Sequence, residues 1–321
     1  MAASARTASG PSPAATPAVA VESLALRKEA RSLWSDAWRQ FRRNKLAMAG
    51  VVVLSFLVLM TLLGPFVWRA PKDAIDFAAS KISPSRAHPF GTNDLGQDML
   101  ARVIWGGRIS MSVGLFVMFV QITLGVVIGA LAGFFGKQTD SILMRITDLF
   151  LALPVLPMLF LSIYLLRDPL FVPFFGPTLG TFLLIVLVIG TLTWMPTARL
   201  VRAEFLSLKQ KEFVEAARSI GADSRAIIMK HILPNVLSPV IVAGSLGIGA
   251  AIITESTLSF LGVGFGPDIP TWGRLLSESR DFLDIAWWLA VGPAAVIFLT
   301  VLSINFIGDG LRDALDPRKS A

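Results

Sequence analysis

The chain contains no cysteine, only two histidines and few charged residues. Without cysteine it cannot form disulfides or thiolate metal sites. The two histidines, His88 and His231, lie far apart in the sequence and form no ligand cluster. Charged residues make up 16% of the chain and hydrophobic residues 54%, whereas a typical soluble domain has about 25% charged residues. This balance argues against a soluble domain and indicates that lipid surrounds the chain.

Motifs for nucleotide or covalent chemistry are also absent. No G-x-x-x-x-G-K-[ST] phosphate loop occurs, and the lone Gly136-Lys137 pair lacks the rest of that motif. There is no H-E-x-x-H and no G-x-S-x-G sequence. We therefore expect no catalytic residue, no metal site and no cofactor bound by this chain.

The N-terminus lacks the pattern of a cleaved signal peptide. Residues 1–21 are mostly small residues and proline, with little charge and no short apolar core. Such a segment has too few large apolar groups to offset the entropy of ordering. We expect a disordered tail there, followed by a first span that acts as an uncleaved anchor.

Long apolar runs are the main feature that is present. A bilayer core of about 30 Å requires about 20 apolar residues in a helix. Six runs approach that length, the fourth being short: 46–68, 110–135, 149–166, 179–195, 236–262 and 285–307. The sequence predicts an all-α integral membrane protein with about six transmembrane helices and with a kink at Pro154 and Pro157.

Lys and Arg are concentrated in two segments, 27–45 and 199–230. Basic segments next to membrane spans stay in the cytoplasm, so we expect both termini, including the tail 314–321, on that side. The long loop 69–108 is then external, where it either contacts an outside partner or caps the spans. The net charge of +7 is explained by this topology and by anionic headgroups, which leaves little reason to infer nucleic-acid binding.

Residues 22–45 have the pattern of an amphipathic helix on the inner membrane surface. Trp34, Trp38 and Phe41 recur at i, i+4 and i+7, and basic residues occupy the other side. An aromatic stripe opposite a basic face is typical of an interfacial helix. We expect this helix to be either a plain anchor or a regulatory element.

Small and polar residues inside the apolar runs predict contacts between helices. Gly125, Gly129 and Gly133 recur every four residues, a spacing that lets helix backbones approach closely in lipid. Three polar side chains also fall within the runs, namely Gln121, Glu255 and Asn305. A charge in a span costs about 2.5–3.5 kcal/mol. We therefore expect Glu255 to have a structural role at a helix end or subunit contact, or else to contact substrate.

The basic segment 199–235 is patterned rather than random. Apolar residues from Phe205 to Ile220 leave one apolar face. Gly221 then stops the helix, because glycine tolerates the left-handed conformation. Asp223 or Ser224 can cap a second short helix, which we expect to end near Pro234. A soluble partner could grip such an exposed helix and move the attached spans as rigid bodies.

This segment resembles the EAA loop of ABC-importer permeases, whose pattern is EAA, three residues, G, nine residues and I-x-L-P. Here Glu215-Ala216-Ala217 is followed at the same spacing by Gly221 and by His231-Ile232-Leu233-Pro234, with His231 in place of the family's Ile. In that family the loop docks in a groove of the ATPase subunit. The resemblance implies the same role here for residues at and after this motif: Glu215, Ala216, Ala217, Gly221, Ala222, Asp223, Ser224 and Ile227.

Other stretches resemble the C-type permeases of the dipeptide/oligopeptide and nickel group of ABC importers. They are 88–98, 108–110 with Gly114, 136–148, 255–262, 270–273, 308–313 and 316–317, in the family's order, with Gln97 where Arg is common. The resemblance implies a type I, MetI-like transmembrane domain over 109–313 in the bacterial inner membrane. It also implies a homologous second permease, two ATP-binding subunits that hold ATP and Mg²⁺, and an external substrate-binding protein.

The sequence leaves the transported solute open. Di- and oligopeptides are expected from the resemblance, with nickel or another small solute as the alternative within the same importer class. An ion-coupled secondary transporter would use discontinuous helices at the midplane, and a membrane enzyme would need clustered acid, base or metal-binding side chains. Neither pattern is visible in this sequence.

Overall fold

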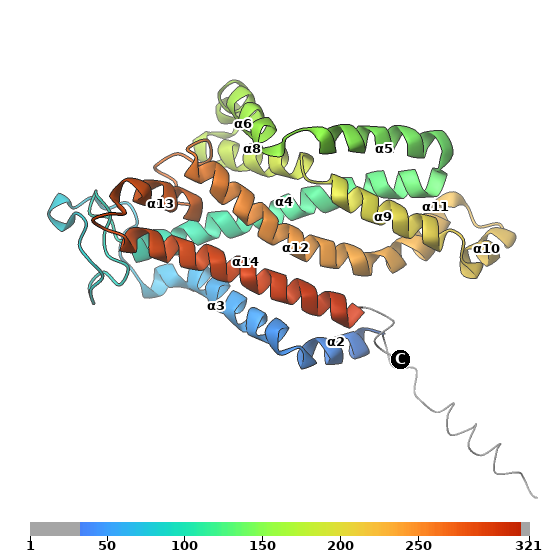
Figure 1. Cartoon of the computed structure of the whole chain (residues 1–321), viewed down its shortest axis with the longest axis horizontal. Coiled ribbons are helices and arrows are strands. Elements are labelled where there is room, and N and C mark those ends of the chain that lie inside the picture. The colour runs from blue at the N-terminus through green and yellow to red at the C-terminus, as the bar shows by residue number, and fades with distance from the viewer. Residues whose placement is uncertain (1–32, 316–321) are drawn as a thin grey trace, which may run out of the picture.

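The computed structural model describes residues 33–315, and within that range the chain is helical with no named strand (Figure 1). The helices are α2 Leu33–Arg43, α3 Lys45–Val67, α4 Met99–Phe135, α5 Lys137–Ala152, α6 Val155–Leu166, α7 Val172–Phe175, α8 Pro177–Thr191, α9 Met195–Leu208, α10 Glu212–Ser219, α11 Ser224–Ala226, α12 Leu233–Phe260, α13 Trp272–Ser279 and α14 Trp288–Leu315. Short 3-10 turns occur at Phe77–Ala79 and Arg280–Phe282, and π-helical turns occur at Arg167–Phe171 and Ile227–Ile232.

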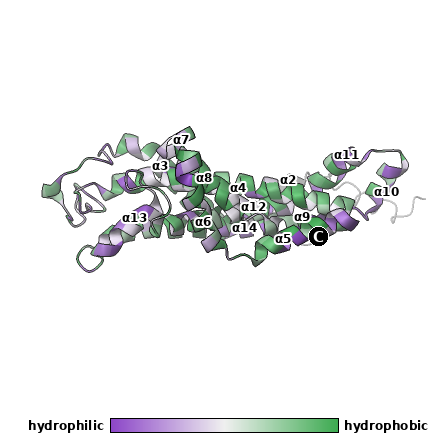
Figure 2. Ribbon diagram, turned by 90° about the horizontal axis from the view of Figure 1, so that it is seen from above, coloured by the Kyte–Doolittle hydropathy of each residue, from purple (hydrophilic) through white to green (hydrophobic). Residues whose placement is uncertain are grey.

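Within the described residues, five helical segments are long and apolar enough to cross a membrane, and a bent pair can make a sixth. The five are Lys45–Val67, Met99–Phe135, Val155–Phe175, Ser224–Phe260 and Trp288–Leu315, and the bent pair is α8 with α9. Apolar residues dominate the middle of the bundle, while polar residues gather toward its two ends (Figure 2). This distribution matches the bilayer placement expected from composition.

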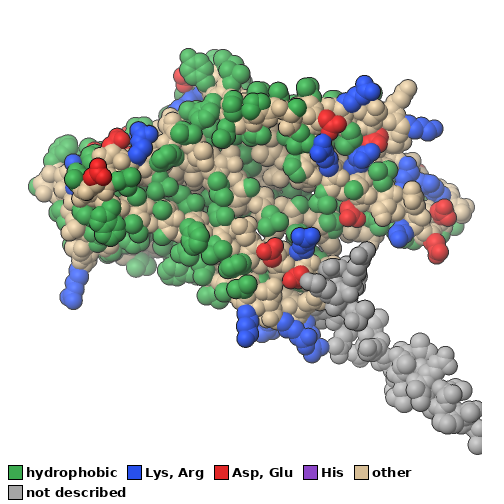
Figure 3. Space-filling view, in the orientation of Figure 1, with side chains coloured by type: hydrophobic (Ala, Val, Ile, Leu, Met, Phe, Trp, Pro, Cys, Tyr) green, Lys and Arg blue, Asp and Glu red, His purple; other side chains and the backbone are tan. Residues whose placement is uncertain are grey.

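The bundle has two distinct ends (Figure 1). At one end, here called the loop end, lie the segment 68–98 and the segment 261–287, which includes α13. At the other, here called the α10 end, lie α10, α11, α2 and the end of α14. Charged side chains gather on the α10 end, and an apolar band covers the middle of the same face (Figure 3).

The predicted outer loop 69–108 is too long, because α4 begins at Met99 rather than near Ser110. Asp98 caps this helix by accepting a hydrogen bond from the Ala101 amide at 2.7 Å. The same carboxylate contacts the indole N–H of Trp68 at 3.0 Å and His88 Nδ1 at 2.8 Å. The first turns of α4 carry basic side chains, so a search for apolar runs misses them.

The third and fourth spans are both broken. Leu153 and Pro154 are extended between α5 and α6, so the kink expected at the prolines is a full break in the helix. The predicted fourth span, 179–195, ends early at Thr191, and α9 follows at a bend of 46°. Met195 and Pro196 begin α9 instead of ending the span.

The expectation that the second short helix ends near Pro234 is wrong. The helix runs without interruption from Ser224 to Phe260. A π-helical turn covers Ile227–Ile232, and the Leu233 amide bonds back to Ile228. Pro234 then lies in the first turn of α12, where a missing N–H is tolerated.

The N-terminal helix is only partly described. α2 packs against the end of α14, where Gln40 donates to the Asp313 carbonyl at 2.9 Å. Phe41 is buried against Gly310, and Trp38 stacks on Phe41 while remaining 59% exposed. The side chain of Trp34, the segment 22–32, the tail 1–21 and residues 316–321 lie outside the described residues, and residues 314–315 of the expected tail belong to α14.

Candidate coupling surface and buried polar sites

The segment 209–226, here called the α10 tip, has a buried rear face. Val214 and Ala217, one helical turn apart on α10, are 0% and 4% exposed. They pack in one apolar cluster with Phe205 of α9 and with Ile227 and Ile232, at the start of the long helix. The same cluster includes α4 and α12 side chains, so α10 is closely packed onto two of the spans.

A tight turn after α10 depends on Gly221. Its φ of +82° is in the left-handed region, which a side chain disfavours. The Gly221 amide bonds to the Arg218 carbonyl at 2.9 Å, and the Ala222 amide bonds to the Ala217 carbonyl at 3.0 Å. This is the hydrogen-bond pattern of a Schellman motif, so the turn fixes how α10 joins the next helix.

Asp223 begins the helix that follows. Its side chain accepts a hydrogen bond from the Ala226 amide at 3.0 Å, which satisfies one of the free N–H groups of the first turn. Of the two caps considered from sequence, the structure therefore uses Asp223 and leaves Ser224 as the first helical residue.

The outward face of the α10 tip is largely exposed. Glu215, Ala216 and Gly221 lie on this face, as do Asp223 and Ser224. Ala222 is half-buried, whereas Ala217 and Ile227 belong to the buried rear face. The eight residues expected to couple thus divide into an outward group and a packing group.

Large apolar side chains also point outward from the tip. On the tip, Phe213 is 41% exposed and Ile220 is 86% exposed, and Met229, just after the tip, is 55% exposed. The sequence places Phe213 and Ile220 on one apolar face with Val214 and Ala217, but the structure separates them. An exposed apolar patch with polar residues around it is typical of a protein-binding surface.

Ionic and polar contacts connect α9 to its neighbours. Arg202 forms a bidentate pair with Asp140 of α5, with 2.7 Å between Nη2 and Oδ2. The hydrogen bond from Arg202 lowers the pKa of the Asp140 carboxyl below its ordinary value. Lys209, just after α9, bonds to the carbonyl of Phe134 and lies 5.5 Å from its ring centroid. These contacts position the base of the α10 tip.

The three glycines expected to pack helices lie against α9. A Cβ on Gly125 would come within 2.6 Å of Thr197 Cβ, and one on Gly129 within 2.4 Å of the Ala198 carbonyl oxygen. On Gly133 it would lie 2.6 Å from Phe205 Cβ. Such distances leave no space for a side chain, so α4 and α9 are in backbone contact along this line.

Glu255 is fully buried near the loop end of α12. Ser259 donates to its Oε1 at 2.7 Å, and Ser110 of α4 donates to its Oε2 at 3.1 Å. The Ser110 hydroxyl in turn accepts from the Trp272 amide at 3.2 Å. These four residues, here called the Glu255 cluster, join α4, α12 and the start of α13, which gives this carboxyl a packing environment rather than an open cavity.

The other two intramembrane polar residues lie in different settings. Gln121 of α4 donates to Thr197 Oγ1 at 3.4 Å and touches Gly247 of α12. Asn305 is exposed and lines an open, mostly apolar groove of about 420 Å³ between α12 and α14. The structure thus brings Gln121 to a helix contact and leaves Asn305 on the surface.

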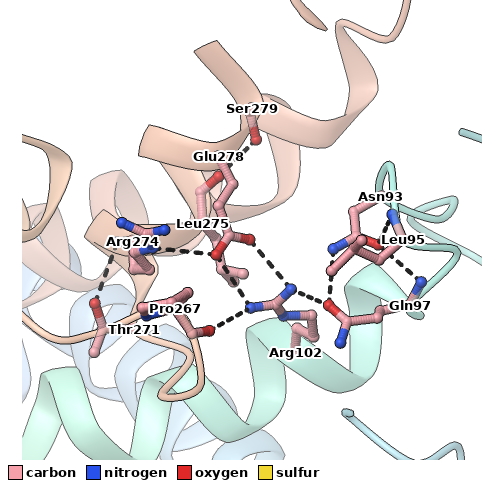
Figure 4. Close-up of polar contacts among 10 residues, drawn as sticks. All are labelled: Asn93, Leu95, Gln97, Arg102, Pro267, Thr271, Arg274, Leu275, Glu278 and Ser279. Atoms are coloured by element: carbon pink, nitrogen blue, oxygen red, sulfur yellow. Dashed lines mark hydrogen bonds and ion pairs between the residues drawn. The ribbon is translucent and has the colours of Figure 1, made fainter. Parts of the chain in front are cut away.

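A second polar group, here called the rim cluster, lies at the loop end (Figure 4). Arg102 of α4 is only 4% exposed, and its guanidinium lies 3.2 and 3.3 Å from the two Glu278 oxygens. It also contacts the Gln97 side chain and, at 3.5 Å, the carbonyl of Pro267. Arg274 binds Glu278 at 3.2 Å. The cluster joins segment 68–98, α4 and α13.

Sequence reasoning missed the rim cluster. Arg102 falls in a predicted loop, and Arg274 and Glu278 form an ordinary i, i+4 pair. One sequence feature did point to this region. Residues 88–98 and 108–110, which resemble the permease family, lie on either side of Arg102 but do not include it.

Comparison with known families identifies two matching regions. Residues 125–321 match the model of "Binding-protein-dependent transport system inner membrane component". Residues 32–89 match the model of "N-terminal TM domain of oligopeptide transport permease C". Together they include the α10 tip, Glu255 and the whole first span.

Curated relatives cover nearly the whole chain. The oligopeptide transport system permease protein OppC of Haemophilus influenzae is 41% identical over 295 residues, which is 91% of each chain. The dipeptide transport system permease protein DppC of Bacillus subtilis is 38% identical, covering 92% of this chain and 89% of the relative. The glutathione transport system permease protein GsiD of Pectobacterium atrosepticum is 37% identical, covering 91% and 93%.

Solved structures show the same fold at lower sequence identity. A chain of the inward-facing MetNI methionine ABC transporter superposes with a TM-score of 0.53 at 17% identity, covering 68% of this chain and 98% of that one. The expected all-α, MetI-like fold is therefore confirmed.

Proposed function

Because the chain belongs to the family of binding-protein-dependent transport system inner membrane components, we propose that it forms, with a homologous second permease, the path by which an ABC importer takes up di- or oligopeptides. Relatives at 37–41% identity carry oligopeptide, dipeptide and glutathione transport in their names. Nickel or another small solute is the alternative within the same importer class.

The exposed α10 tip is the observation that carries the proposal. Its outward face presents Glu215, Ala216 and two large apolar side chains, Phe213 and Ile220, while its rear face packs into the spans. A separate ATP-binding subunit that binds this surface would move the tip and the spans together. The spans of this chain would pack in two alternative arrangements. ATP bound to the partner subunit would favour the arrangement that the ATP-bound subunit binds more tightly.

We propose an orientation with the α10 end in the cytoplasm of a bacterial cell and the loop end outside its inner membrane. Lys and Arg are concentrated in 27–45 and 199–230, and the described part of the first segment, 33–45, lies at the α10 end together with α10 and α11 of the second. Basic flanks next to spans stay inside. The substrate-binding protein then docks at the loop end, and both termini are cytoplasmic.

ATP and Mg²⁺ are assigned to two partner ATP-binding subunits, and no cofactor is assigned to this chain. Its residues supply packing and contact surfaces, and no bond of the substrate is broken along the path. In this proposal Glu215 and the turn at Gly221 transmit force, and Glu255 maintains the contact of α13 with the spans.

A reconstituted importer tests the function. The chain is purified with the second permease and the ATP-binding subunits, placed in vesicles, and supplied with its substrate-binding protein. We expect ATP-dependent accumulation of radiolabelled dialanine or trialanine and none when an ion gradient replaces ATP. Uptake of Ni²⁺ instead would assign the alternative substrate. Uptake driven by the gradient alone would refute the importer assignment.

The absence of cysteine makes the orientation directly testable. Ala216→Cys lies on the α10 tip and Ser83→Cys on the loop end, and both positions are exposed. A membrane-impermeant thiol reagent applied to the periplasmic face should label only the Ser83 variant. Labelling of only the Ala216 variant would reverse the proposed orientation.

A further inference from the structure

The segment 261–287, here called the α13 segment, lies at the loop end and is held there at two places that differ in burial. Near its middle, Trp272 is fully buried and donates its indole N–H to the Val103 carbonyl at 3.0 Å. Its amide joins the Glu255 cluster. A Cβ on Gly273 would lie 2.4 Å from the Ser256 carbonyl oxygen. This first attachment is sealed from water and has no free space.

The second attachment is the rim cluster, which is less enclosed. The side chain of Glu278 is 19% exposed and that of Arg274 is 23% exposed, whereas Arg102 is 4% exposed. Arg102 Nε is buried with no hydrogen-bond partner among the described residues. Water can therefore reach the carboxylate of the pair, while its guanidinium stays anchored in α4. The rim cluster is thus the attachment that can open, because its carboxylate can be rehydrated.

The chain before α13 can accommodate such a movement. Gly262 has φ +83°, and added Cβ atoms on Gly262 and Gly266 would meet nothing within 4 Å. Glycines of this kind absorb large backbone changes. An open cavity of about 640 Å³ lies beside Gly262 and is lined by α6, by Arg167 and Asp168 and by Gly262 and Val263. The segment before α13 therefore has two glycines without close neighbours and, beside Gly262, adjacent free volume.

We propose that Arg102 is a positioning residue for transport: its pairing with Glu278 holds the end of α13 across the loop end, and this pair must separate when the loop end opens toward the substrate-binding protein. The sealed contact at Trp272 acts as the fixed point of that movement. The proposal rests on the proposed function, because it assigns a step within the same transport cycle.

Reversible cross-linking tests the proposal in the reconstituted importer. The double variant Arg102→Cys, Glu278→Cys lacks the ion pair, and a short bifunctional thiol reagent that is cleavable by reductant can bridge the two positions. The other subunits are used in cysteine-free form. We expect bridging to abolish uptake of trialanine and reductant to restore it.

A matched control places both cysteines within the α13 segment itself. Arg280 and Asp281 form an exposed ion pair at the same end, and bridging Arg280→Cys to Asp281→Cys does not join α13 to α4. This variant should transport equally with and without the bridge. Full uptake by the bridged Arg102, Glu278 variant would overturn the proposal.

Single substitutions give an independent measurement that does not depend on cross-linking or on the behaviour of the double variant. Glu278→Gln keeps the size of the side chain but removes its charge. It therefore weakens the attachment of α13 to Arg102 without changing the packing volume. We expect ATP hydrolysis without the substrate-binding protein to rise about fivefold, the effect of a modest loss of stabilisation, and its stimulation by that protein to shrink. Arg102→Lys, which keeps the charge, should fall between this variant and the wild type.

The outcomes separate a positioning role from a purely structural one. A structural role alone would lower assembly, basal hydrolysis and uptake in parallel, and that result would contradict the proposal. Unchanged hydrolysis in Glu278→Gln would contradict it as well. If the wild-type assembly fails to import any peptide, the proposed function fails instead, and this is seen before any variant is compared.

Discussion

Replacing Gly221 by proline tests whether the turn after α10 transmits motion. The residue has φ +82°, whereas proline is fixed near −65°, so the turn cannot form. The substitution also removes the amide that bonds to Arg218, a loss of about 1 kcal/mol. Gly221→Ala is a milder change, because its Cβ meets nothing within 4 Å and its cost is the left-handed backbone alone, about 1–2 kcal/mol.

The expected result is a graded loss of coupling. In the reconstituted importer, Gly221→Pro should assemble and hydrolyse ATP but lose at least about tenfold in peptide uptake per ATP, which corresponds to about 1.4 kcal/mol. Gly221→Ala should keep most of its uptake, because the hydrogen bonds of the turn survive. Glu215→Lys, which reverses a charge on the exposed face, should also uncouple hydrolysis from uptake.

Gly136 provides a matched control for Gly221. It too has a positive φ, +64°, with nothing within 4 Å of an added Cβ, but it joins α4 to α5 and is not part of the α10 tip. Its ψ is −160°, and this combination of angles is essentially limited to glycine, so Gly136→Ala should cost at least as much stability as Gly221→Ala and leave the ratio of uptake to hydrolysis unchanged. Normal uptake by both Gly221→Pro and Glu215→Lys would refute the role of the tip.

Three further predictions concern stability and packing. Gly129→Val should lower the melting temperature of the purified protein and separate α4 from α9, with overpacking costing about 1–3 kcal/mol, because a Cβ there would lie 2.4 Å from a backbone oxygen; an unchanged melting temperature would contradict the backbone contact. Glu255→Leu should destabilise the protein more than Glu255→Gln in thermal unfolding in detergent, because leucine leaves Ser110 and Ser259 without an acceptor. Equal unfolding temperatures of the two variants would contradict a structural role for these hydrogen bonds. The pKa of Asp140 is lowered by its hydrogen bond from Arg202. The contribution of this carboxylate to stability is therefore present above the ordinary carboxyl pKa of about 3.9 and is lost as pH falls through the lower pKa of the folded state. Asp140→Asn should make thermal unfolding less sensitive to acid, and an unfolding profile with the wild type's pH dependence would refute this.

The sequence predicted features that depend on local chemistry. Six apolar runs gave the all-α class and the membrane, and the spacing from Glu215 to Pro234 gave the family. From residue types alone, Gly221 is expected at a turn and either Asp223 or Ser224 at a cap; the structure has the turn and uses Asp223 as the cap. These features need only a few neighbouring residues, so sequence patterns can identify them.

Features that depend on distant parts of the chain were missed. Arg102 at the start of α4 was assigned to a loop, because its charge interrupts the apolar pattern while its compensating partner, Glu278, lies 176 positions away. Pro234 is expected from the sequence to end a helix. In the structure a π-helical turn just before it lets the helix continue, and no local pattern indicates that turn. The outward position of Ile220 depends on how α10 packs on Phe205 and Ile227, which no short segment specifies.

Cross-linking is the most direct test of whether an ATP-binding subunit binds the α10 tip. Ala216→Cys is exposed on the tip and can be paired with single cysteines placed around the groove of an ATP-binding subunit, with Ser83→Cys at the loop end as the control. We expect only the Ala216 variant to form a disulfide with that subunit, and we expect reduction to restore peptide uptake. Cross-linking through Ser83 instead, with none through Ala216, would contradict it.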